Sequence, residues 1–172
     1  GVPYLDIPEN VPNREWILEA LAPSVGRLRI GLVWAGSSLH ARNERRSIPF
    51  EAFAPLADWS EVAWHSFKID AEALPPLPGI LSLAPLLSNF SDTAYALSGM
   101  DLVITVDTAV AHLAGALGIP TWLLISFIPD WRWLLDRDDT PWYQTLRLFR
   151  QTKPGDWTGI LRQMAALVST PA

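Results

Sequence analysis

Short apolar runs alternate with stretches of helical periodicity along most of the chain. The apolar runs predict strands, and their near-continuous hydrophobicity is typical of parallel strands covered on both faces. The predicted strands are residues 28–34, 61–67, 80–83, 102–106, 121–125 and 145–149. The predicted helices are residues 14–21, 50–57, 91–98, 109–117 and 157–168, with Ser91 and Asp92 as the cap of the third. This alternation predicts βαβ units, and therefore an α/β fold with a mostly parallel sheet.

The segment 101–125, DLVITVDTAVAHLAGALGIPTWLLI, is the most informative of these units. Asp107 and Thr108 follow a predicted strand and precede a helix of small residues, which Gly118 is placed to cap. Ligands of open α/β sheets bind at that edge, and a helix N-terminus there attracts an anion through its unpaired amides. The small residues also fit ordinary helix-to-sheet packing, and spacing alone does not separate the two interpretations.

Composition narrows the classes of function. The chain has 172 residues, 49% of them hydrophobic, so it can bury a core within one domain. Its net charge of −5 argues against binding to the phosphate backbone of nucleic acids. The absence of cysteine excludes disulfides and thiolate metal sites. No apolar run approaches the roughly 20 residues of a transmembrane helix, and the first residues lack the pattern of a signal peptide, so we expect a cytoplasmic protein.

Three polar constellations follow predicted strands. The first is the loop GSSLHARNERRS, where arginines suit an oxyanion, although charge runs are usually solvated. The second is Asp107 to Ala109 with His112, a histidine that equally fits a packed side chain bonded to a backbone carbonyl. The third is residues 130–137 with Trp142 and Tyr143, which suit stacking on a sugar or base, or a lid over the sheet edge. The GxGxxG, GxxxxGK[ST], GxSxG and HExxH motifs are absent, so these residues alone indicate only an anion-binding edge.

Three strings carry a more specific resemblance: VWAGSSLHARNERRSIP, DLVITVDTAVAHLAGALG and IPDWRWLLDRDDTPWYQTLRLFRQTKPGDW. Together they resemble the C-terminal half of a bacterial glycosyltransferase-like family whose members are often fused behind tetratricopeptide repeats. That family is similar to lipopolysaccharide heptosyltransferases and, more distantly, to O-linked N-acetylglucosamine transferases. The resemblance implies one half of a GT-B fold, a Rossmann-like three-layer sandwich that binds a nucleotide-sugar donor. On this interpretation residues 1–27 are an interdomain linker with a short helix, and residues 28–172 are the donor-binding domain.

The resemblance also implies roles for individual residues. Arg46 and His112 would be catalytic, with Arg46 compensating the charge of the leaving group. The donor would be bound by Gly36, Ser37, Arg42, Arg45, Asp70, Asp107, Thr108, Ala109 and Val110. Among these, Asp107 to Val110 would form the diphosphate loop, and Asp70, in the segment 67–70, would bind ribose hydroxyls. The chain departs from the family in that segment, where Gln often precedes a small residue, and at Ala109, where heptosyltransferases have Gly.

The implied chemistry is glycosyl transfer without a metal or other cofactor. The expected partners are a nucleoside diphosphate sugar, the N-terminal half of the GT-B fold and tetratricopeptide repeats upstream. A complete GT-B enzyme needs about twice this length, so we expect the chain to be inactive alone and its exposed apolar surface to favour homodimerisation. The alternative is an inactive nucleotide-binding or protein-interaction domain that uses its tryptophan-rich tail for contacts.

Overall fold

The computed structural model describes residues 2–37 and 43–168. Its centre is a sheet of six strands in the order β3-β2-β1-β4-β5-β6, and every neighbouring pair is parallel. The strands are β1 Leu28–Val33, β2 Val62–Ser66, β3 Leu81–Ser82, β4 Leu102–Val106, β5 Thr121–Ile125 and β6 Leu146–Arg150. The predicted α/β class and parallel sheet are therefore confirmed.

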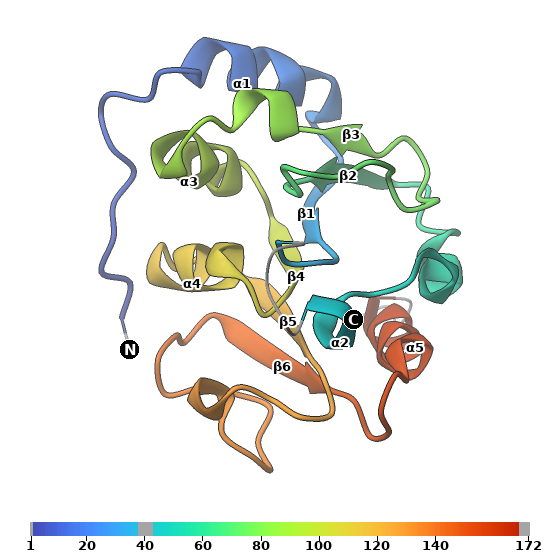
Figure 1. Ribbon diagram of the computed structural model, residues 1–172. Coiled ribbons are helices and arrows are strands. Elements are labelled where there is room, and N and C mark those ends of the chain that lie inside the picture. Colours follow the sequence, from blue (N-terminus) through green and yellow to red (C-terminus); the bar gives the residue numbers. More distant parts are fainter. Residues whose placement is uncertain (1, 38–42, 169–172) are drawn as a thin grey trace.

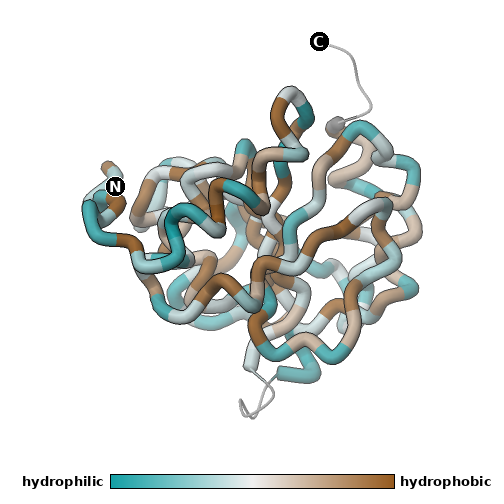
Figure 2. Tube along the Cα trace, turned by 90° about the horizontal axis from the view of Figure 1, so that it is seen from above, coloured by the Kyte–Doolittle hydropathy of each residue, from teal (hydrophilic) through white to brown (hydrophobic). Residues whose placement is uncertain are grey.

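Helices cover both faces of this sheet, which gives the predicted three layers (Figure 1). One face carries α1 Arg14–Leu21, α3 Phe90–Ser98 and α4 Ala109–Ala116. The other face carries the 3-10 helix η2 Phe50–Leu56 and the helix α5 Trp157–Val168. The short helix α2 Asn43–Arg46 and the 3-10 turns η1 Ala22–Ser24, η3 Ala84–Leu86 and η4 Trp131–Trp133 complete the elements. Hydrophobic and hydrophilic segments alternate along the trace, as amphipathic helices around a buried sheet require (Figure 2).

Among the described residues, three clusters of buried side chains hold the layers together, and two of them lie on opposite faces of the sheet. Phe53 and Leu56 of η2 pack with Leu161 of α5 over one face of the sheet. Ile17 and Leu97 pack with Val103 over the other face, so α1 contributes to the same core as the sheet. No helix within the described ranges combines the length and the apolarity needed to cross a membrane.

Local chemistry changed two of the predicted elements, and one short helix was not predicted. Within the predicted helix 50–57, residues 50–56 form a 3-10 helix because Pro55 lies inside the segment and has no N–H to donate. Helix α3 is capped by Asn89, whose Oδ1 accepts from the Asp92 amide at 2.9 Å, and not by Ser91 or Asp92. The carboxylate of Asp92 is fully buried and accepts from the Asn13 backbone and side chain instead. The sequence analysis also missed α2, a single turn within a polar loop.

The strand order places β1 beside β4, with the first crossovers running away from β1 on one side and the later ones on the other. The loops after these two strands therefore diverge and leave a crevice at their carboxyl ends. This is the edge at which the sequence predicted an anion site.

Candidate functional site

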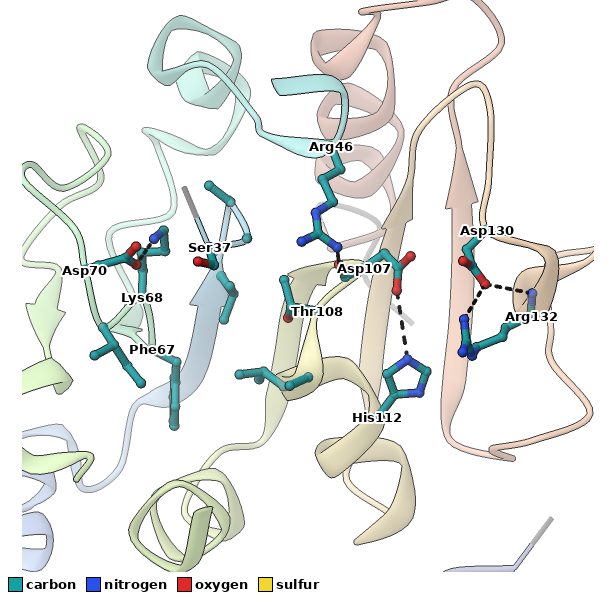
Figure 3. Close-up of a pocket in the computed structure, with 16 residues that line it drawn as sticks. Ser37, Arg46, Phe67, Lys68, Asp70, Asp107, Thr108, His112, Asp130 and Arg132 are labelled. Atoms are coloured by element: carbon teal, nitrogen blue, oxygen red, sulfur yellow. Dashed lines mark hydrogen bonds and ion pairs between the residues drawn. The ribbon is translucent and has the colours of Figure 1, made fainter. Parts of the chain in front are cut away.

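A cavity of about 640 Å³ lies at the carboxyl ends of β1, β2, β4 and β5 (Figure 3). The lining residues come from the loops after these strands and from the first turn of α4. They are Val33, Ala35, Gly36, Ser37, Arg46, Phe67, Lys68, Ile69, Asp70, Asp107, Thr108, Ala109, Val110, His112, Asp130 and Arg132. The three loops singled out in the sequence thus meet in one cavity.

The N-terminus of α4 forms the centre of the cavity wall. Its N-cap, Thr108, has extended backbone angles, and its hydroxyl lies 3.2 Å from the hydroxyl of Thr105 and makes no capping bond. The amides of Ala109 and Val110 have no acceptor within the helix, because the first turn of any helix lacks one. They line the cavity, where the helix dipole adds partial positive charge. The wall therefore offers backbone donors to an anion.

Arg46 brings a guanidinium to the same wall from α2. Its Nη1 donates to the backbone carbonyl of Asp107 at 2.6 Å, which joins the loop after β1 to the loop after β4. Its Nε is buried and has no hydrogen-bond partner among the described residues. A Cβ on Gly36 would lie 2.8 Å from both Cζ and Nε of Arg46, so the guanidinium fits only because residue 36 is glycine.

His112 lies one turn into α4, between a carboxylate and a phenol. Its Nε2 is 3.9 Å from Oδ1 of Asp107, its Nδ1 is 3.0 Å from the Tyr143 hydroxyl, and its ring stacks on Trp133. Burial lowers the pKa of His112 and Arg132 lowers it further, whereas the carboxylates of Asp107 and Asp130 oppose this change. Burial also raises the pKa of Tyr143 to about 12, so the phenol keeps its proton. We assign a neutral imidazole that accepts from Tyr143 and carries its proton on Nε2.

Charged pairs flank the two ends of the cavity. On the β2 side, Nζ of Lys68 contacts Oδ1 of Asp70, and the Lys68 side chain is largely buried while that of Asp70 is half exposed. On the β5 side, Nη1 of Arg132 is 2.8 Å from Oδ1 of Asp130, and both side chains are partly exposed. No group of three or more His, Asp or Glu side chains in the described parts of the chain is arranged to hold a metal ion.

Nine of the predicted site residues line this cavity, and Arg45 does not. Arg42 and His40 lie outside the described residues. Arg45 lines a separate cavity of about 340 Å³ together with Phe127 and Gln151. It points elsewhere because neighbouring residues on a helical turn project in different directions.

Lys68 and Arg132 lie in the segments 67–70 and 130–137 that the sequence analysis named, but neither was selected as a site residue. The position after a strand pointed to these segments and did not identify the individual side chains.

Part of this chain matches a known protein family, and most of it matches a known protein. The family model described as glycosyltransferase family 9 (heptosyltransferase) matches residues 68–124, which include Lys68, Asp70 and the whole Asp107–His112 segment. Protein FlbA of Caulobacter vibrioides is 27% identical, with the match covering 92% of this chain and 27% of that protein. The chain therefore spans about a quarter of the length of this relative.

A solved structure supports the fold. The crystal structure of a family 9 glycosyl transferase from Veillonella parvula DSM 2008 superposes with a TM-score of 0.55 over 95% of this chain and 51% of that one, at 15% sequence identity. This chain has the α/β, Rossmann-like fold of that structure and spans about half its length. The fusion to tetratricopeptide repeats and the likeness to O-linked N-acetylglucosamine transferases remain predictions.

Proposed function

We propose that this chain is the donor-binding, C-terminal half of a metal-independent, nucleotide-sugar-dependent glycosyltransferase. The observation that carries the proposal is the convergence of the free α4 amides, at Ala109 and Val110, with the Arg46 guanidinium in one cavity. Amides at a helix N-terminus and a guanidinium fork are the groups that proteins use to bind phosphate oxygens. The match of residues 68–124 to the glycosyltransferase family 9 model points to the same class.

These residues would act on the leaving group. As the bond between the anomeric carbon and the diphosphate oxygen breaks, its electron pair goes to that oxygen, and negative charge grows there. Arg46 and the amides of Ala109 and Val110 would stabilise this charge, a role that needs no metal ion. Such fixed donors act without reorganisation when the charge develops, and each is typically worth about 3 kcal/mol.

The other parts of the cavity would orient the donor. The carboxylate of Asp70, which pairs with Lys68, would accept hydrogen bonds from ribose hydroxyls. His112 is close to the diphosphate position, as a neutral donor through Nε2. The acceptor and the base that deprotonates it would be bound by the N-terminal half, so the chain alone would bind a donor without transferring its sugar.

Calorimetry on the 172-residue chain tests the proposal. The chain is titrated with UDP, GDP, ADP, CMP and their sugar conjugates, with and without EDTA. We expect one nucleotide class to bind clearly and equally in both conditions, and to raise the thermal stability of the chain by mass action. A folded chain that binds none of them contradicts the proposal and favours a protein-interaction domain. Binding that disappears with EDTA contradicts metal independence.

A further inference from the structure

A second, smaller cavity adjoins the diphosphate site on the β5 side. It measures about 270 Å³ and is lined by Tyr4, His112, Trp131, Arg132, Trp142 and Tyr143, which we call the aromatic cage. His112 and Arg132 line both cavities, so the two cavities adjoin at these side chains. Trp131 is 69% exposed and Trp142 48% exposed, an unusual exposure for side chains of this size beside a polar site.

The cage is held in shape by several specific contacts. Nε1 of Trp142 donates to the backbone carbonyl of Arg132 at 2.8 Å, and the Arg132 guanidinium lies 4.9 Å from the centre of the Trp131 ring. The loop that carries them contains two non-glycine residues with left-handed backbone angles, Leu134 (φ 53°) and Asp136 (φ 55°). Such angles cost free energy and persist where the surrounding structure imposes them, often at ligand sites. The exposed rings are therefore fixed in position.

The arrangement of the rings favours a sugar over a nucleobase. A base stacks best in a flat slot, but within the cage the Tyr143 ring is inclined by 64° to His112, and Tyr4 stacks on Tyr143 at 23° with 6.4 Å between the ring centres. These three lining rings do not form a flat slot, and a guanidinium and an imidazole lie at the side shared with the diphosphate site. A pyranose has an apolar C–H face that suits aromatic rings and hydroxyls that suit Arg132 and His112.

Figure 3 shows the order of the groups along the sheet edge: Lys68 and Asp70 on one side, Thr108 with Arg46 in the middle, and Arg132 on the other side. If the diphosphate lies at the α4 N-terminus and the ribose at Asp70, the glycosyl group lies towards Arg132. Ligand pockets typically measure about 300 to 1,000 Å³, so the cage, at about 270 Å³, suits a monosaccharide and not a whole nucleotide. We infer that the aromatic cage binds the glycosyl moiety of the donor, an inference that rests on the proposed function.

The test compares two ligands in matched variants. The affinities of a nucleoside diphosphate and of its sugar conjugate, taken from the panel above, are measured by calorimetry in Trp131→Ala and Trp142→Ala. We expect each variant to lose about tenfold in affinity for the conjugate and less than about twofold for the nucleoside diphosphate. Trp16→Ala removes an equally exposed tryptophan from α1, away from both cavities, and is the control.

The outcomes separate the inference from the proposed function. If the wild type binds no nucleotide, the proposed function fails and this inference with it. If the wild type binds but both variants lose affinity equally for the two ligands, the cage holds the base, and the glycosyl assignment is wrong. Unchanged affinity for both ligands in Trp131→Ala also overturns it, since this exposed side chain can be removed without disturbing the core. Trp142→Phe keeps a ring but removes the bond to Arg132, and retained affinity for the conjugate would support stacking.

Discussion

Arg46 and Gly36 act as a unit at the residue scale, because the guanidinium lies against the backbone where any side chain on residue 36 would stand. The bond from Arg46 to the Asp107 carbonyl keeps the guanidinium beside the α4 amides. Its buried Nε lacks a partner among the described residues, which is costly unless a ligand or water satisfies it. This arrangement is suited to a guanidinium that binds an anion.

The first prediction separates the two neighbouring arginines of α2. Arg46→Ala is expected to weaken nucleoside diphosphate binding by about 30-fold, because a hydrogen bond to a charged group contributes about 2 kcal/mol. Arg45→Ala, which removes the same charge from a separate cavity, is expected to change binding by less than about threefold. Calorimetry on both variants checks this. Equal losses would mean that overall charge, and not the position of Arg46, determines affinity.

Sequence reasoning grouped residues that do line one cavity where the backbone forms the wall, as at Asp107 to Val110. It was less successful where the direction of a side chain determines which cavity the residue lines. The adjacent residues Arg45 and Arg46 of the string NERR line different cavities, and only Arg46 lines the main one. Lys68 and Arg132 join the site only because the loops after β2 and β5 turn towards α4. No local pattern in the sequence reports that direction.

At the scale of elements, α4 links the diphosphate site to the aromatic cage. Its N-terminus faces the main cavity, and its C-terminal carbonyl at Ala116 accepts hydrogen bonds from the amides of Tyr4 and Leu5. Gly118 follows the helix with φ +74°, and a Cβ there would collide with the ring of Pro3. The end of α4 therefore positions the segment that brings Tyr4 to the cage.

The second prediction concerns this C-cap. Gly118→Ala and Gly155→Ala both place alanine at a left-handed φ, which costs about 1 to 2 kcal/mol in the free energy of unfolding. Gly155→Ala meets open space, whereas Gly118→Ala also displaces Pro3, so its loss is expected to be larger by about 1 kcal/mol. Urea denaturation of the two variants measures the difference. Equal losses would indicate that the Pro3 contact does not restrain the N-terminal segment.

Periodicity predicted the elements closely where burial dominates. The strands β4 and β5 and the helices α1 and α5 begin and end at the predicted residues. The errors arose where a specific polar or backbone interaction determines the type or the start of a helix, as with Pro55 in η2 and the Asn89 cap of α3. The all-parallel order of the sheet followed from the βαβ pattern, because each strand is separated from the next by a crossover.

At the scale of the whole molecule, two histidines couple stability to pH. His65 is almost fully buried in β2, and burial lowers its pKa from the ordinary value of 6.5. Burial lowers the pKa of His112 in the same way. Both imidazoles are neutral in the folded chain near neutral pH, and the unfolded chain binds protons more readily below pH 6.5.

The third prediction follows from that difference. Because the unfolded state takes up more protons, the free energy of unfolding should fall as pH decreases through 6.5, and should become nearly constant only about one pH unit above that value. Denaturation in urea between pH 7.5 and about 5.5, above the range in which most carboxylates titrate, measures the effect. The decrease should be smaller in His65→Gln and in His112→Gln. An unchanged slope in both variants would contradict the account.

The central claim is that the amides at the start of α4 bind a diphosphate, and the chemical shifts of those amides test it directly. The ¹H–¹⁵N NMR spectrum of the chain is followed while UDP, GDP or ADP is added, whichever binds in the panel. We expect the largest shifts at Ala109 and Val110, with smaller ones at Gly36 and Ser37. Saturable binding that leaves Ala109 and Val110 unshifted, and instead shifts residues around Arg45 and Phe127, would contradict the claim.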